Sequence, residues 1–177
     1  MTENTIHSQF GEITFDSIDS IPNDALLEEL VDLSISLFEN KPNHKYFSVL
    51  KQKPALMLLA RNSNNTLIAC KIGYQYSDDV FYSWIGGVHT KFRKHGIAQY
   101  LMQMQHEWCR NQNFRMIRTK TLFNNSIMYA LNVKNGFSII GNDISGKNGP
   151  KLIYSKLLSS HPQDRIWKSS LSYLQQW

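Results

Sequence analysis

Residues 84–105, WIGGVHTKFRKHGIAQYLMQMQ, join a β-rich run to a helical run through a basic turn that contains glycine. From Gly96 onward, apolar side chains recur at helical spacing. The first amides of a helix lack intrahelical partners and lie at the positive end of its dipole, so such a turn binds anions. Gly96 lets the backbone approach closely, and Arg93 and Lys94 supply charge that suits a pyrophosphate. The alternative is a solvated basic turn that simply starts a helix.

The rest of the chain alternates between strand-like and helix-like patterns. Upstream, apolar spacing and turn residues predict a strand at 10–18, followed by a helix that Asn23 or Asp24 caps. They then predict a short helix at 43–51 and three strands, at 55–60, 66–76 and 80–88. Downstream of the helix that begins at Gly96 they predict a strand at 114–121, a helix at 125–135, and strands at 137–144 and 150–157. An antiparallel first half followed by strand–helix alternation predicts an α/β fold (α+β mixed sheet) with helices on both faces.

Length and composition favour one domain. The chain has 177 residues, of which 42% are hydrophobic, and this is enough apolar material for one core. We expect a single domain over 1–160 and a tail over 161–177 that packs on the domain or on a second subunit. The tail has apolar residues at spacing typical of an amphipathic helix: Ile166, Trp167, Leu171, Leu174 and Trp177.

Charge and cysteine usage limit the partners and the compartment. The net charge of +5 comes from dispersed Lys and Arg residues, so we rank nucleic acid below a small phosphorylated ligand. Cys70 and Cys109 are not in a CxxC spacing, which favours reduced thiols. The N-terminal residues have no signal-peptide pattern and no run is long enough to span a membrane, so we expect a cytoplasmic protein without membrane contact.

A second motif is NNSIMYALNVKNGF, residues 124–137. Gly136 can end the predicted helix in a left-handed conformation, and Phe137 can start the next strand. Asn125 fits two roles equally well, a contact with a cofactor or a simple helix cap.

Together these segments resemble motifs A and B of the GNAT superfamily of acetyl-CoA-dependent N-acetyltransferases. Motif A requires Arg or Gln, two residues, Gly, one residue, then Gly or Ala, and Arg93, Gly96 and Ala98 fit it. Motif B is matched at Asn125, Leu131, Gly136 and Phe137, and the resemblance spans most of residues 10–157. It implies transfer of an acetyl group to a primary amine, of a small molecule or a peptide, with acetyl-CoA as co-substrate and no metal.

The resemblance also implies a single GNAT-like domain whose mostly antiparallel sheet contains a central, splayed parallel strand pair. The pantetheine arm would lie along that gap near Val88, although an ordinary bulge also explains Gly86 and Gly87. The cofactor-binding residues that it implies are Gly87, Val88, Arg93, Lys94, His95, Gly96, Ile97, Ala98 and Asn125.

The catalytic positions depart from the family pattern. The amine would attack the thioester directly, helped by proximity, while proton transfers need an acid and a base. The motif B tyrosine that protonates the thiolate in many members is replaced here by Asn132, which can still donate a hydrogen bond to the sulfur. Tyr129, one turn earlier, is a substitute acid or a packed aromatic residue. Tyr82 stands where some relatives have a glutamate in the strand, which favours deprotonation of the amine through a water molecule. His89 is either a candidate base or an ordinary surface histidine.

The acceptor pocket of the superfamily corresponds to residues 38–47 and 74–82. Asp78 and Asp79 are candidates for holding a cationic amine, and Tyr74 and Tyr82 for walling it, although each also fits a solvated or packed position. The substrate-binding residues that we single out are Glu39, Tyr46 and Tyr76.

Two other functions remain open. The chain can be a coenzyme A-binding regulatory module without turnover, which the missing motif B tyrosine favours. It can also be a nucleic-acid binder, in which case affinity falls steeply with salt and acetyl-CoA does not compete. The tryptophan-bearing tail also favours a homodimer.

Overall fold

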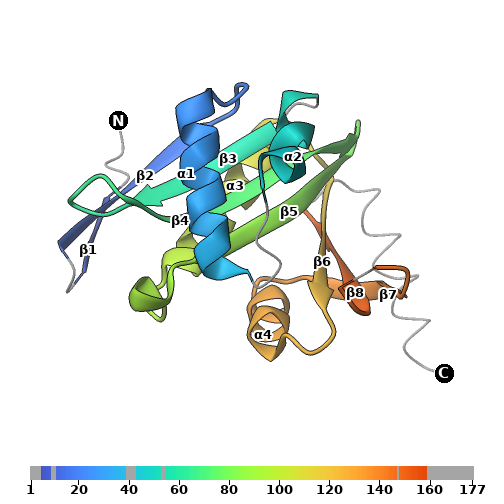
Figure 1. The fold of residues 1–177 in the computed structure, drawn as a ribbon. Coiled ribbons are helices and arrows are strands. Elements are labelled where there is room, and N and C mark those ends of the chain that lie inside the picture. Colours follow the sequence, from blue (N-terminus) through green and yellow to red (C-terminus); the bar gives the residue numbers. More distant parts are fainter. Residues whose placement is uncertain (1–4, 9–10, 39–42, 53–54, 147, 159–177) are drawn as a thin grey trace. The chain divides into compact units, whose positions relative to one another are not determined.

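The computed structural model describes residues 5–8, 11–38, 43–52, 55–146 and 148–158 (Figure 1). The chain divides into two compact units. Unit 1 comprises residues up to Tyr76 together with Tyr82–Glu107, and unit 2 comprises Ser77–Phe81 and the residues from Trp108 onward. The expected tail, 161–177, lies outside the described residues, so the boundary after residue 160 stays a prediction.

In the part of unit 1 that the structure describes, five strands follow one another in the order of the chain. They are β1 (Thr5–Ser8), β2 (Gly11–Ile18), β3 (Ala55–Arg61), β4 (Leu67–Ser77) and β5 (Val80–Val88), and the turn between β4 and β5 belongs to unit 2. Pairing is antiparallel from β1 through β4. Strand β1 was not predicted from the sequence, because its four residues do not alternate between apolar and polar. It is a strand because it pairs with β2.

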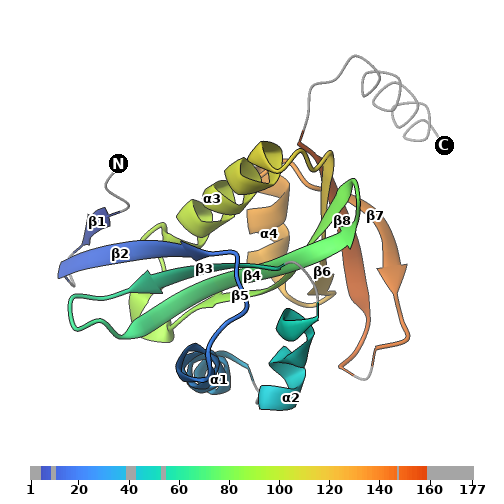
Figure 2. The same ribbon diagram turned by 90° about the horizontal axis from the view of Figure 1, so that it is seen from above.

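Helices cover both faces of this sheet. They are α1 (Asp24–Leu37), α2 (His44–Phe47) and α3 (Ile97–Asn111), with 3-10 turns η1 (Ser48–Lys51) and η2 (Thr90–Phe92). Figure 2 shows α1 and α2 on one face of the strands of unit 1 and α3 on the other. This arrangement explains why β3 is apolar at every position from Ala55 to Ala60 and buried throughout, since both of its faces are covered.

The main core of unit 1 lies between the sheet and the helices α1 and α2. Asn23 starts α1 by accepting a hydrogen bond from the amide of Leu26 at 2.9 Å, as predicted from the sequence. The buried stripe of α1 then packs with α2, η1 and alternate residues of β3, β4 and β5. The residues that form this core include Leu26, Leu27, Leu30, Phe47, Leu50, Met57, Leu59, Ile72 and Ile85.

The described residues of unit 2 form three strands in the order β6-β8-β7 and one complete helix. The elements are β6 (Met116–Leu122), α4 (Ser126–Lys134), β7 (Ser138–Asp143) and β8 (Lys151–Leu157), and β8 pairs antiparallel with both neighbours. After α4, Gly136 has φ +81°, the left-handed conformation predicted from the sequence, and the next residue, Phe137, is buried. In the described part of the chain, no helix is long and apolar enough to cross a membrane.

The thiol of Cys70 provides a pH-dependent test of this fold. Burial raises its pKa from 9.0 to about 12, against smaller opposing effects of Lys71 and of the Gly87 backbone. The folded state therefore holds the thiol protonated, and this contribution to stability is complete below about pH 9 and is lost as the pH rises toward 12.

From pH 8 to pH 10.5, we expect the free energy of unfolding to fall by about 2 kcal/mol more in the wild type than in Cys70→Ala. Urea denaturation of both proteins at each pH measures the difference. Parallel pH dependence in the two proteins would contradict a buried, protonated thiol.

Candidate active site

The turn that the sequence predicts as an anion site has the expected backbone. It runs from Val88 at the end of β5 through η2 to Ile97 at the start of α3. Gly96 has φ +77°, and its carbonyl accepts the first helical hydrogen bond, from the amide of Tyr100 at 2.9 Å. A Cβ atom on Gly96 would meet no atom within 4 Å, so the space next to Gly96 at the start of α3 is open. The amides of Ile97 and Ala98 lie in the first turn of α3, where a helix provides no acceptor for them, so they can reach a phosphate group there.

Hydrogen bonds within unit 1 hold this turn against the sheet. The amide of His89 donates to the carbonyl of Ile68 on β4 at 2.8 Å, and the carbonyl of His89 accepts from the amide of Phe92. Nε of Arg93 donates to the carbonyl of Val88 at 3.0 Å. Arg93 therefore ties the end of β5 to the turn, while its two terminal amino groups can still meet a ligand.

The other residues predicted to bind the cofactor divide into anchors and exposed groups. Ile97 is buried and fixes the start of α3, and Ala98 is half-buried beside it. Lys94 is exposed and has φ +68°, a left-handed conformation that is uncommon for a residue with a side chain. His95 is half-buried. The turn therefore carries exposed cationic side chains, and the buried Ile97 fixes the start of the helix that follows it.

The glycine pair in β5 has a packing explanation. A Cβ atom on Gly87 would lie 2.6 Å from Cδ1 of Leu37, the last residue of α1, and one on Gly86 would lie 3.3 Å from the carbonyl oxygen of Cys70. At Gly86 the approaching group is therefore the backbone of β4, and at Gly87 it is a side chain of α1. A role of Gly87 and Val88 in cofactor binding stays a prediction.

Asn125 and Asn132 both have structural partners in unit 2. The side-chain oxygen of Asn125 accepts from the amide of Met128 at 3.0 Å, so Asn125 caps α4. Asn132 is buried, and its Nδ2 donates to Oγ1 of Thr121 on β6 at 3.2 Å. Its side-chain oxygen is buried without a hydrogen-bond partner among the described residues. Contacts of either amide with a cofactor stay predictions.

Tyr129 differs from Asn132 in its exposure. Its side chain is 46% exposed on α4, so its hydroxyl has access to solvent or to a ligand. The neighbouring Tyr154 on β8 is buried, and this desolvation, with a further contribution from Tyr129, raises the pKa of Tyr154. Tyr129 is therefore the more accessible phenol of the two.

His89 lies at the end of β5. It is half-buried, its ring packs edge-on against Phe92 with centroids 6.1 Å apart, and its Nδ1 accepts from the amide of Lys91 at 3.4 Å. If Nδ1 acts as an acceptor, Nε2 carries the proton in the neutral ring. The role of His89 as a base stays a prediction.

Predicted acceptor residues form an aromatic cluster in unit 1. Tyr46 of α2 stacks on Trp84 of β5 with ring centroids 4.7 Å apart, and burial raises the pKa of the Tyr46 hydroxyl. Tyr74 packs against Trp84 and Tyr82, and Tyr82 packs against Tyr76. Tyr46 and Tyr76 are 44% and 62% exposed, so both rings present surface to an acceptor. Trp84 was not predicted as a site residue, although it lies two residues after Tyr82 and therefore on the same face of β5.

Of the three acidic candidates, the structure describes Asp78 and Asp79. Glu39 lies outside the described residues. Asp78 and Asp79 are exposed and belong to unit 2, where Asp79 forms an ion pair with Arg115 at 3.8 Å. Among the described residues, no group of three or more His, Cys, Asp or Glu side chains is placed to hold a metal ion.

Comparisons with known proteins agree with this geometry. The sequence model of the Acetyltransferase (GNAT) family matches residues 24–137, which is more than half of the chain. A comparison with curated protein sequences gives no match.

Solved structures resemble this fold closely. The structure of Ard1 from Thermoplasma volcanium aligns with a TM-score of 0.74 at 14% identity, over 84% of this chain and 99% of that one. The ribosomal-protein-S18-alanine N-acetyltransferase from Escherichia coli aligns with a TM-score of 0.69 at 14% identity, over 83% and 94%. A GNAT family acetyltransferase from Elizabethkingia anophelis, solved with acetyl-CoA bound, aligns with a TM-score of 0.64 at 18% identity, over 82% and 97%.

These likenesses confirm the α/β fold with a mixed sheet that the sequence predicts. The family match includes the whole of both motifs, from the turn at Arg93–Ala98 to Phe137. The chain therefore belongs to the Acetyltransferase (GNAT) family.

Proposed function

We propose that this protein is an N-acetyltransferase that moves the acetyl group of acetyl-CoA to a primary amine in a ternary complex. The observation that carries the proposal is the turn before α3, where Gly96 has a positive φ and open space beside it. A β-carbon there would fill the position that a pyrophosphate needs to reach the helix amides. The residues present therefore fit the cofactor.

The cofactor-binding residues act in two ways. The amides at Gly96, Ile97 and Ala98 would donate to the pyrophosphate, and the exposed Arg93 and Lys94 side chains would add charge. Gly87, Val88 and His95 complete the strand end and the turn, and Asn125 can contribute its side-chain NH2 group, since its oxygen caps α4.

A bound acetyl-CoA supplies a thioester carbonyl that an amine can attack directly. The chain must hold both reactants in line, accept the proton of the incoming ammonium and provide one to the departing thiolate. His89 is our candidate base: its Nδ1 would have to release the amide of Lys91 to accept the proton, which water would relay past Tyr82. Asn132 has a partner in Thr121, and its second Nδ2 hydrogen is the group that would reach the sulfur.

Tyr129 is our candidate acid, because its hydroxyl is exposed on α4. We expect Tyr129→Phe to lower kcat about 10- to 100-fold while the affinity for acetyl-CoA stays within twofold. Steady-state kinetics and calorimetry measure the two quantities. Unchanged turnover would assign Tyr129 to packing alone.

The acceptor site that we propose uses the exposed rings of Tyr46 and Tyr76, with Glu39 as the predicted carboxylate. Aromatic faces attract an ammonium group, which suits the protonated amine before transfer. A homodimer and a cytoplasmic location remain further proposals; the two free, buried cysteines support the second.

Calorimetric titration with acetyl-CoA tests the proposal directly. We expect micromolar binding by the wild type and none by an Arg93→Glu, Gly96→Trp variant. Thiol release with a panel of small amines and peptides then identifies the acceptor. Absence of both heat and thermal stabilisation at millimolar acetyl-CoA would overturn the proposal.

A second function is supported by one observation. The residue at the position of the usual acid, Asn132, is buried and bonded to Thr121, as expected for a structural amide. A regulatory module would bind acetyl-CoA as tightly as an enzyme but release no thiol with any amine in the panel.

A further inference from the structure

A cleft of about 380 Å³ opens in unit 1 beside the connection from β2 to α1. Its lining shares no residue with the turn before α3 or with the aromatic cluster. One wall is apolar and one end is charged. The apolar residues include Ile18, Ile21, Ala25 and Leu26, and the charged residues are Glu29 and Arg61.

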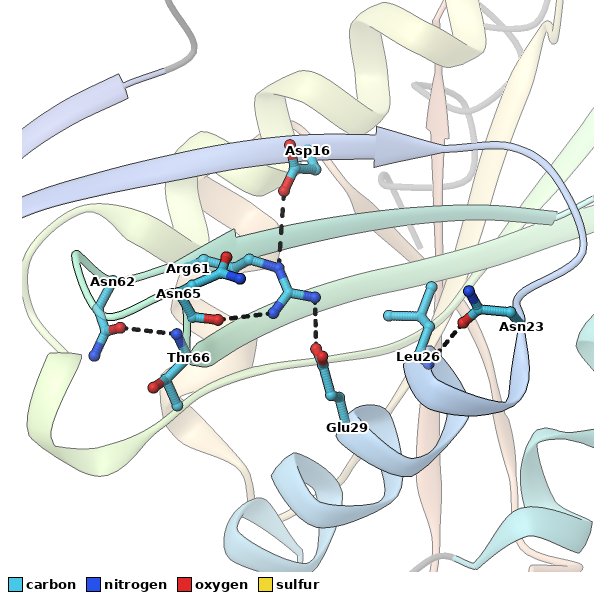
Figure 3. A network of polar contacts seen from close by, with 8 residues as sticks. All are labelled: Asp16, Asn23, Leu26, Glu29, Arg61, Asn62, Asn65 and Thr66. Atoms are coloured by element: carbon cyan, nitrogen blue, oxygen red, sulfur yellow. Dashed lines mark hydrogen bonds and ion pairs between the residues drawn. The ribbon is translucent and has the colours of Figure 1, made fainter.

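The guanidinium of Arg61 is largely buried and contacts three elements. The side chain of Arg61 is only 15% exposed, and Figure 3 shows its guanidinium between β2, α1 and the β3–β4 turn. Nη2 of Arg61 donates to Oε2 of Glu29 at 2.5 Å, Nη1 donates to the carbonyl of Asn65 at 3.0 Å, and Nε lies 3.9 Å from Oδ2 of Asp16. Because three elements fix the guanidinium, its position would change little on binding.

Both charged groups line the cleft, and the contacts above leave part of their hydrogen-bonding capacity unused. These contacts use one oxygen of Glu29, whose side chain is 43% exposed, and one hydrogen on each terminal nitrogen of Arg61. A purely anionic ligand would meet the Glu29 carboxylate, and a purely cationic one would meet the Arg61 guanidinium. A ligand that carries both charges satisfies both groups.

The apolar wall limits the rest of the ligand. Ile21 lines the cleft and is 67% exposed. Covering Ile21 would remove apolar surface from water, which favours binding in proportion to the area buried. The ligand should therefore have a compact apolar group beside its charged groups.

We propose that this cleft binds a free α-amino acid with a branched aliphatic side chain. Its ammonium group contacts Glu29, its carboxylate contacts Arg61, and its side chain lies against Ile18, Ile21 and Leu26. The site is separate from the proposed cofactor site, so the inference holds whether or not the protein transfers acetyl groups.

Thermal unfolding of the full chain with small probes tests the charge requirement. We expect 10 mM L-leucine to raise Tm by about 3 °C if its Kd is about 1 mM. The matched probes are 3-methylbutylamine, which lacks the carboxylate, and 4-methylpentanoate, which lacks the amine. Both should raise Tm by less than 1 °C. No shift with L-leucine, or equal shifts with a single-charge probe, would overturn the proposal.

Variants on α1 locate the binding. Glu29→Gln should weaken L-leucine binding at least tenfold by calorimetry, and Ala25→Trp, at an exposed position lining the cleft, should abolish it by filling the space. Glu28→Gln is the control, because Glu28 is exposed, pairs with His44 and does not line the cleft. Undiminished binding by a folded Ala25→Trp protein would place the ligand elsewhere and reject the site.

Discussion

Replacing Gly96 with valine is expected to weaken acetyl-CoA binding at least a hundredfold. Gly96 has φ +77°, a conformation that a β-branched residue adopts only with strain. The new side chain would also fill the open space beside the first turn of α3. Losing two charge-assisted hydrogen bonds to a phosphate costs about 3 kcal/mol, which is a factor of about 100 in Kd. Calorimetric titration of the two proteins measures the loss.

Gly149→Val is the matched control for that experiment. Gly149 has φ +94° and likewise no atom within 4 Å of an added Cβ, but it lies in the turn before β8. Both variants should lose similar stability in urea, because the backbone strain is similar. Only the Gly96 variant should lose affinity for acetyl-CoA. Equal affinities in the two variants would show that the phosphate does not bind at this turn.

Local signals explain why the elements could be predicted from the sequence. Asn23 and Asn125 occupy cap positions whose side chains accept from the amide three residues later, and both do so in the structure. The turn at residues 62–65 closes with a hydrogen bond from Asn65 to Asn62, and Asn65 has φ +60°. Such caps and turns depend on neighbouring residues, so a single sequence carries the information.

The side-chain partners could not be predicted, because they join distant segments. Arg61 and Glu29 are 32 positions apart, and nothing in either local pattern indicates that they form an ion pair. The same holds for Asn132 and Thr121, and for Gly87 and Leu37, whose contact explains the glycine without a ligand. These contacts arise only when helices pack on the sheet, which a periodicity argument does not describe.

Phe47→Ala should cost about 3–5 kcal/mol in the free energy of unfolding. Phe47 ends α2 and is fully buried, with its ring 5.8 Å from that of Trp84 and 5.6 Å from that of Tyr46. Removing it leaves a cavity under the stacked pair of Tyr46 and Trp84. Urea denaturation measures the loss, and a change in native tryptophan fluorescence would report the altered packing of Trp84.

Tyr46→Ala tests the exposed part of the same aromatic cluster, whereas Phe47→Ala tests its buried part. Tyr46 is 44% exposed, so truncation removes the stack on Trp84 but creates little cavity, and we expect a loss of about 1 kcal/mol. If Tyr46 contacts the acceptor, this milder variant should nevertheless raise KM for the amine more than Phe47→Ala does. A larger stability loss for Tyr46→Ala than for Phe47→Ala would mean that the stacked pair, rather than the buried ring, holds α2 on the sheet.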